Sequence, residues 1–118
     1  RRSIAFPFWP YNFKNRKVID IVELPPTFMD IWSSKNNPRE SLEKHFSEIE
    51  RTCSLAVIDW HANIFNNKRY CNLADSYVYN ISRMALRKDV WIASMEDIGK
   101  WWEYRSKKLG YNQNNQNQ

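Results

Sequence analysis

The chain alternates between stretches with the two-residue period of a strand and stretches with the apolar spacing of a helix. Residues 18–24 predict a strand, because β-branched side chains dominate them and Pro25 and Pro26 follow. Residues 38–53 predict a helix, because apolar side chains recur every three or four positions, at Leu42, Phe46, Ile49 and Cys53. A short apolar run over 54–60 then predicts a second strand.

Helix boundaries support this pattern and extend it to the second half of the chain. Asn37 before Pro38 is typical of an N-cap followed by a proline in the first turn. Apolar spacing from Leu73 to Ala85 predicts another helix, and residues 89–93 predict a third short strand. Ser94 is expected to cap a final helix, since Asp97 stands three residues later, close to a capping box.

The resulting order of strand, helix, strand, helix, strand, helix predicts an α/β fold with parallel strands and helices packed outside them. Three such units cannot close a barrel, which needs about seven or eight. An open sheet of this size would leave its edge strands bare. We therefore expect the carboxyl-terminal half of a distorted (β/α)₇ barrel over residues 1–110, followed by a disordered Asn/Gln tail at 111–118.

Composition and charge exclude several classes of function. The 18 Lys and Arg residues exceed the 13 Asp and Glu residues by five, which gives a net charge of +5. The basic residues are scattered along the chain, so the sequence shows no basic stripe for nucleic acid. No apolar run reaches the length of a membrane span. With two glycines the chain has no phosphate-binding loop, and it has no GxSxG nucleophile motif. Cys53 and Cys71 are too few for a disulfide framework; they form one bridge or remain ordinary thiols.

His61 is the first candidate for chemistry, because it ends the apolar run 54–60 and ligands collect at the carboxyl ends of parallel strands. It could act as a general acid or base, ligate a metal, or bond a neighbouring backbone group. Asp59 precedes it by two residues on the same strand face, where it could orient the imidazole or bond a loop amide. His45 is expected at the boundary of a helix's apolar stripe. The chain by itself contains no complete metal site.

Aromatic side chains offer two interpretations. Rings near the start of the chain and at strand ends could form a platform for sugar rings, or they could pack in the core. The residues concerned are Phe6, Phe8, Trp9, Tyr11, Trp60 and Trp91.

Four motifs in sequence resemble the polysaccharide deacetylase family, which has the NodB-homology domain of carbohydrate esterases. They are Arg1 with Pro7-Phe8 and Tyr11-Asn12, then the segment from Pro26 to Asp30, then Asp59-Trp60-His61, then the segment from Val90 to Ile98 with Trp102 and Arg105. The resemblance covers about residues 1–105. It implies a distorted (β/α)₇ barrel that hydrolyses amide bonds of N-acetylated sugars with the help of a divalent, zinc-like metal.

Residue roles follow from the same resemblance. His61 matches the histidine that protonates the leaving amine, and Arg1 resembles the arginine that orients the catalytic aspartate. Trp60 and Trp91 resemble aromatics that line the acyl pocket, and Tyr11 stands near a position whose backbone holds the oxyanion. Asp59 replaces a leucine found in many members, which affects the acyl pocket or tunes His61.

The family's aspartate-rich strand end and its HxxxH pair are not in this chain, so the base and the metal ligands would come from a missing amino-terminal half. We expect a metal-dependent hydrolase of carbon–nitrogen bonds with a carbohydrate substrate, and an inactive protein when these 118 residues are isolated. The alternative is a non-catalytic domain that binds carbohydrate or docks a partner. A nucleic-acid module is the least favoured interpretation. The compartment is not determined, although a polysaccharide substrate would favour the cell envelope or exterior.

Overall fold

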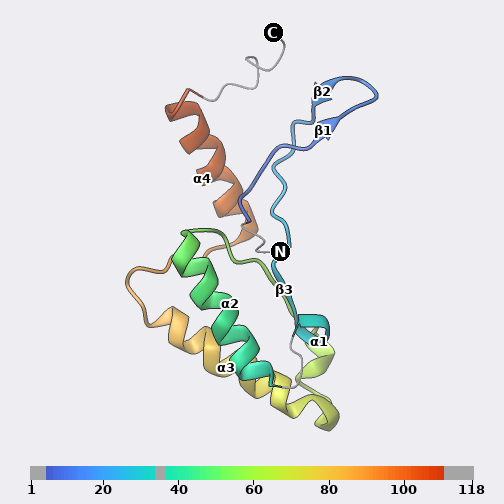
Figure 1. Cartoon of the computed structure of the whole chain (residues 1–118), viewed down its shortest axis with the longest axis vertical. Helices are drawn as coiled ribbons and strands as arrows, with labels where there is room; N and C mark the ends of the chain where they lie inside the picture. The colour runs from blue at the N-terminus through green and yellow to red at the C-terminus, as the bar shows by residue number, and fades with distance from the viewer. Residues whose placement is uncertain (1–4, 34–36, 111–118) are drawn as a thin grey trace. The chain divides into compact units, whose positions relative to one another are not determined.

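A computed structural model describes residues 5–33 and 37–110 of the chain (Figure 1). The chain divides into two compact units. One unit comprises Pro26–Ile92 together with the start of the chain, and the other comprises Phe6–Pro25 and Ala93–Gln118. Arg1 and the tail at 111–118 lie outside the described residues, so the predictions made for them stay predictions.

Helix α2 (Pro38–Thr52) is the element that the sequence predicts most directly. The Asn37 side chain accepts a hydrogen bond from the Glu40 backbone N–H, and Pro38 occupies the first turn, where its missing N–H costs nothing. The helix ends where Cys53 adopts a left-handed conformation with φ of 48°. Both the predicted N-cap and the predicted extent are confirmed.

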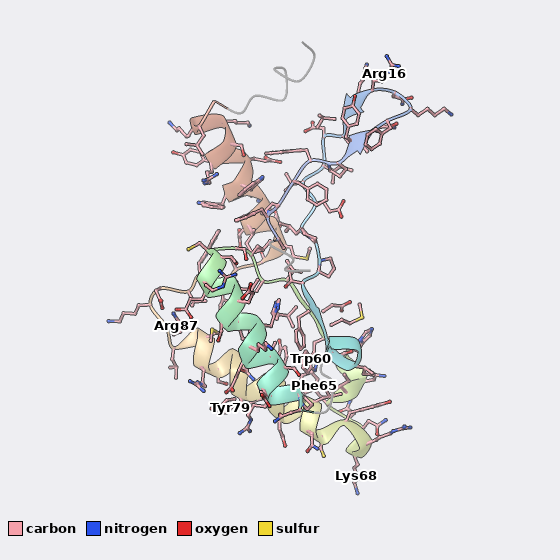
Figure 2. The ribbon with its side chains drawn as sticks, viewed as in Figure 1. Arg16, Trp60, Phe65, Lys68, Tyr79 and Arg87 are labelled. Atoms are coloured by element: carbon pink, nitrogen blue, oxygen red, sulfur yellow. The ribbon has the colours of Figure 1, made fainter. Side chains whose placement is uncertain are left out.

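Helix α3 (Cys71–Ala85) packs along α2, and Figure 1 shows the two side by side. Two short 3₁₀ helices, η1 (Ala62–Ile64) and η2 (Lys68–Tyr70), lead into it. Leu42 of α2, Ile64 of η1 and Leu73 of α3 are buried and belong to the apolar core of this unit. On the outer side, the Arg39 guanidinium lies 4.0 Å from the centre of the Tyr79 ring, which Figure 2 labels.

Strands β3 (Phe28–Met29) and β4 (Ile58–Asp59) form a two-stranded parallel sheet. Phe28 pairs with Ile58, and Met29 pairs with Asp59. Both strands advance in the same direction, so their carboxyl ends meet at one edge. The four-residue helix α1 (Asp30–Ser33) follows β3 directly, and His61 lies two residues beyond the end of β4.

The other unit contains a hairpin and a helix. Strands β1 (Tyr11–Asn12) and β2 (Lys17–Val18) pair antiparallel around a turn in which Arg16 has a positive φ of 50°. Helix α4 (Met95–Lys108) begins as predicted, because the Ser94 hydroxyl accepts a hydrogen bond from the Asp97 backbone N–H. The ring of Trp102 on α4 stacks on Phe6 of the same unit at 6.3 Å.

The α/β class is confirmed by three longer helices and two small sheets, one of them parallel. Three predicted strands are wrong or too long. Residues 18–24 contribute only Val18 to a strand and Glu23 to an isolated bridge with Phe8. The run 54–60 is reduced to the two residues of β4, and residues 89–93 form no strand.

The physical reason for these differences is the lack of pairing partners. An extended segment becomes a strand only when its backbone groups pair with a neighbour. Leu24 is buried, but Ile19 and Ile21 are exposed, so most of the apolar alternation of 18–24 does not face a core. Asp89 lies in a turn where its carboxylate pairs with Arg87. No barrel closure is seen among residues 5–33 and 37–110.

Candidate functional site

The candidate site lies where β3 and β4 end, and it is built around Asp30 and His61. Asp30 is the first residue of α1 and its side chain is fully buried. His61 lies in the loop after β4 and keeps 55 % of its side chain exposed. The parallel register of the two strands brings these residues together although they are 31 positions apart in sequence.

The Asp30 carboxylate is held by three hydrogen bonds. Its Oδ2 accepts from the backbone N–H of His61 at 2.8 Å and contacts the Nδ1 of the His61 ring at 2.8 Å. Its Oδ1 accepts from the backbone N–H of Ile31. A buried carboxylate is tolerated when its oxygens are satisfied in this way.

These contacts determine the charge of the acid. Burial by itself raises the pKa of the Asp30 carboxyl. The backbone hydrogen bonds from His61 and Ile31, with the hydrogen bond and charge of the imidazole, outweigh burial and hold that pKa below its ordinary value. Asp30 is therefore ionised at neutral pH and can only accept hydrogen bonds.

An ionised Asp30 also determines the tautomer of His61. Because the carboxylate offers no proton, Nδ1 must carry one and donate it to Oδ2. That hydrogen bond, together with the negative charge of Asp30, raises the pKa of His61 above its ordinary value. Nε2 is left free of hydrogen bonds to any residue within 5–33 or 37–110, so it can take up and release a proton.

Asp59 contributes less than its spacing suggests. Its negative charge adds to the rise in the His61 pKa, but the residue that orients the imidazole is Asp30. The sequence left open whether Asp59 orients the imidazole or bonds a loop amide. In the structure the carboxylate that contacts the imidazole is Asp30, at the start of α1.

The aromatic residues predicted for substrate binding occupy different environments. Trp60 stacks on Phe28 with ring centres 6.2 Å apart and contacts Tyr77 at 5.1 Å. Phe65, labelled beside Trp60 in Figure 2, meets the same tyrosine edge-on. These contacts are those of a packed ring. Trp91, in contrast, is 57 % exposed and follows no strand.

Other predicted site residues lie elsewhere or outside the described part. Tyr11 belongs to the unit that contains the hairpin, where its ring contacts Phe13 edge-on at 5.0 Å. Arg1 is not among the described residues, so its predicted partnership with an aspartate stays a prediction. Cys53 and Cys71 are both free and exposed, which agrees with ordinary thiols.

His45 lies inside the same unit, partly buried in α2. Its Nε2 is 2.9 Å from the hydroxyl of Thr27, and its ring contacts Phe28 at 5.3 Å. Burial lowers the pKa of His45, so this histidine is neutral under conditions in which His61 is protonated. The pKa of His45 is thus shifted down and the pKa of His61 is shifted up.

Residues that could hold a metal ion do not gather in the described part of the chain. Across 5–33 and 37–110, no group of three or more His, Cys, Asp or Glu side chains is arranged for one. The divalent metal that the family resemblance implies stays a prediction, with its ligands expected outside this chain. No helix in the same residues is long and apolar enough to cross a membrane.

Asp30 is the residue of the candidate site that was not singled out from the sequence, although the segment from Pro26 to Asp30 formed part of the family resemblance. A usable signal was present. Asp30 follows the short apolar pair Phe28–Met29, just as His61 follows the apolar run of β4. Carboxyl ends of adjacent parallel strands meet at one edge, so an acid and a histidine at two such ends become neighbours.

Comparison of the chain with protein-family models, with curated proteins and with solved structures finds no match.

Proposed function

We propose that this chain supplies the general acid of a hydrolase that removes acetyl groups from an N-acetylated sugar or polysaccharide. The observation that carries the proposal is the hydrogen bond from His61 Nδ1 to the buried carboxylate of Asp30, with 55 % of the His61 side chain exposed. The same pairing of a carboxylate with an imidazole is what a general acid or base requires, because it orients the ring and stabilises its charged form. The family resemblance supplies the reaction class.

The proposed step is a proton transfer in the breakdown of the tetrahedral intermediate. Water adds to the carbonyl carbon of the acetamide, and the carbon–nitrogen bond then breaks. The leaving nitrogen must accept a proton, because an amine anion is too basic to leave. His61 Nε2–H donates that proton, while Asp30 stabilises the imidazolium before the transfer.

The proposal includes a division of the site between this chain and residues that it does not contain. The parallel pair β3–β4 with α2 and α3 beside it is compatible with part of a (β/α)₇ barrel. A base and metal ligands would come from the other half of such a barrel. We therefore expect the isolated 118 residues to be inactive. Robust metal-dependent deacetylation by these residues alone would contradict the proposal that the base and the metal ligands lie outside this chain.

The test uses the longest protein that carries this sequence, assayed for bound metal and for acetate released from an N-acetylglucosamine oligomer. His61→Ala is expected to lower kcat by about 10²–10⁴-fold, the usual contribution of a positioned acid. Metal content should not change, since His61 donates a proton and is no ligand in this scheme. Asn66→Ala, an exposed neighbour in the same loop, is the matched control and should keep full activity.

Two outcomes would overturn the proposal. Equal activity in His61→Ala and the parent protein would remove His61 from the chemistry. A metal-free, inactive protein that still binds the oligomer would favour the non-catalytic carbohydrate-binding domain.

A further inference from the structure

Thr27 contacts the backbone of Val57 beside the junction between β3 and β4. Thr27 precedes β3, and its backbone N–H donates to the carbonyl of Val57 at 2.8 Å. Its hydroxyl oxygen accepts from the Val57 backbone N–H at 3.1 Å and lies 3.1 Å from the Val57 carbonyl. One threonine thus satisfies both backbone groups of the residue opposite it.

His45 completes this contact from the side of α2. Its Nε2 lies 2.9 Å from the same Thr27 hydroxyl, and its ring packs on Phe28. A hydroxyl has one proton and can accept two hydrogen bonds. It can therefore bind Val57 N–H and neutral His45 at once, whichever ring tautomer is present.

The contact between Thr27 and Val57 lies a few residues before both members of the candidate site. Thr27 is three residues before Asp30, and Val57 is four residues before His61. The named strands between them are only two residues long, so few backbone hydrogen bonds define their register. A slip of one residue would turn side chains to the opposite face and separate the carboxylate from the imidazole.

We propose that Thr27 and His45 are positioning residues that set the register of β3 against β4 and so bring Asp30 to His61. This inference rests on the proposed function for its catalytic meaning, but the register itself can be measured without any substrate. Neither residue touches the reacting atoms. Their effect passes through the backbone of the two strands.

The experiment compares Thr27→Val, which keeps the shape and removes the hydroxyl, with Thr27→Ser, which keeps the hydroxyl. NMR titration of the His61 ring in each folded protein reports the Asp30 hydrogen bond directly. In Thr27→Val the pKa of His61 is expected to fall toward the 6.5 of a free imidazole, because the bond to Asp30 is lost. In Thr27→Ser the raised pKa should be retained.

Thr52→Val is the matched control. The Thr52 hydroxyl bonds the Glu48 carbonyl within α2 and the Ser54 hydroxyl just beyond it, so Thr52→Val removes threonine hydrogen bonds without touching a residue of β3 or β4. The His61 titration should be the same in Thr52→Val as in the parent protein. A folded Thr27→Val protein with the parent titration would overturn the proposal.

A second variant decides the matter if Thr27→Val does not fold. His45→Phe keeps a ring against Phe28 and removes the nitrogen that contacts Thr27. A partial fall in the His61 pKa is expected, and an unchanged titration would contradict the part assigned to His45. Loss of deacetylation with an intact titration in every variant would count against the proposed function alone. The two failures are therefore distinguishable.

Discussion

At the scale of single residues, the tautomer and the pKa of His61 depend on the carboxylate of Asp30, which precedes it by 31 residues in the sequence. Asp30 is fully buried and ionised, and it contacts the Nδ1 of an imidazole whose side chain is half exposed. Asp59 is nearer in sequence but acts on His61 only through its charge. The hydrogen bond to the buried carboxylate of Asp30 raises the pKa of His61 more than the charge of the half-buried Asp59 does.

The first prediction concerns this pair. Asp30→Asn should lower the pKa of His61, because both the charged acceptor and its Coulombic attraction are lost. Asp59→Asn should lower it by a smaller amount. Carbon-detected or nitrogen-detected NMR titration of the two histidines measures both effects. A larger fall in Asp59→Asn than in Asp30→Asn would contradict the geometry described for the site.

The same substitution has a consequence for catalysis if His61 is the general acid. An acid must be protonated to act, so activity falls as pH rises through its pKa. The raised pKa of His61 places that alkaline limb at higher pH than a free imidazole would. Asp30→Asn should therefore move the alkaline limb of the pH–rate profile to lower pH. An unmoved limb would show that another group titrates there.

At the scale of elements, helix α2 is the support on which the site unit is built. Its N-cap, its first-turn proline and its apolar stripe were all visible in the sequence, since each depends on residues within one turn of another. Helices α3 and α4 were predictable for the same reason. The strands were not, because pairing depends on residues far away in sequence and apolar alternation does not say which partner is present.

Leu42 offers a test of this support. It is fully buried on α2, so Leu42→Ala leaves a cavity and should lower the free energy of unfolding by about 2–5 kcal/mol. Leu86, which is 85 % exposed after α3, is the matched control, and Leu86→Ala should change stability by less than about 0.5 kcal/mol. Urea denaturation of the two variants makes the comparison. Equal losses would contradict the assignment of Leu42 to the core.

At the scale of the whole molecule, the Asp30–His61 pair links folding stability to pH. The pKa of Asp30 is lowered, so its contribution is present above its unfolded pKa and disappears as pH falls through the folded value. The pKa of His61 is raised, so its contribution is complete below about pH 6.5 and disappears as pH rises through the folded value. The pair is therefore most stabilising between those limits.

Comparison with His61→Gln isolates this effect. The difference in free energy of unfolding between parent and variant should be largest below about pH 6.5, where Asp30 is still ionised, and should shrink as pH rises through the raised pKa of His61. Denaturation followed through amide resonances of α2 reports the unit that contains the pair. The lowered pKa of His45 also reduces the free energy of unfolding as pH falls below its ordinary value. His45 is present in both proteins, so its contribution cancels in the difference between them. A difference that grows with pH would contradict the raised pKa of His61.

The sequence by itself determined the α/β class, the positions of three helices and the choice of His61 as the residue to follow. Helix caps, prolines and apolar spacing act within a few residues of one another, so they can be recognised from the sequence alone. The tertiary structure decided the strands and the partner of His61. Asp30 meets His61 only because β3 and β4 run parallel in one register, with Thr27 and His45 beside their junction. Contacts of that kind join residues about 30 positions apart, and although Asp30 and His61 each follow a short apolar run, no local pattern shows that the two runs pair.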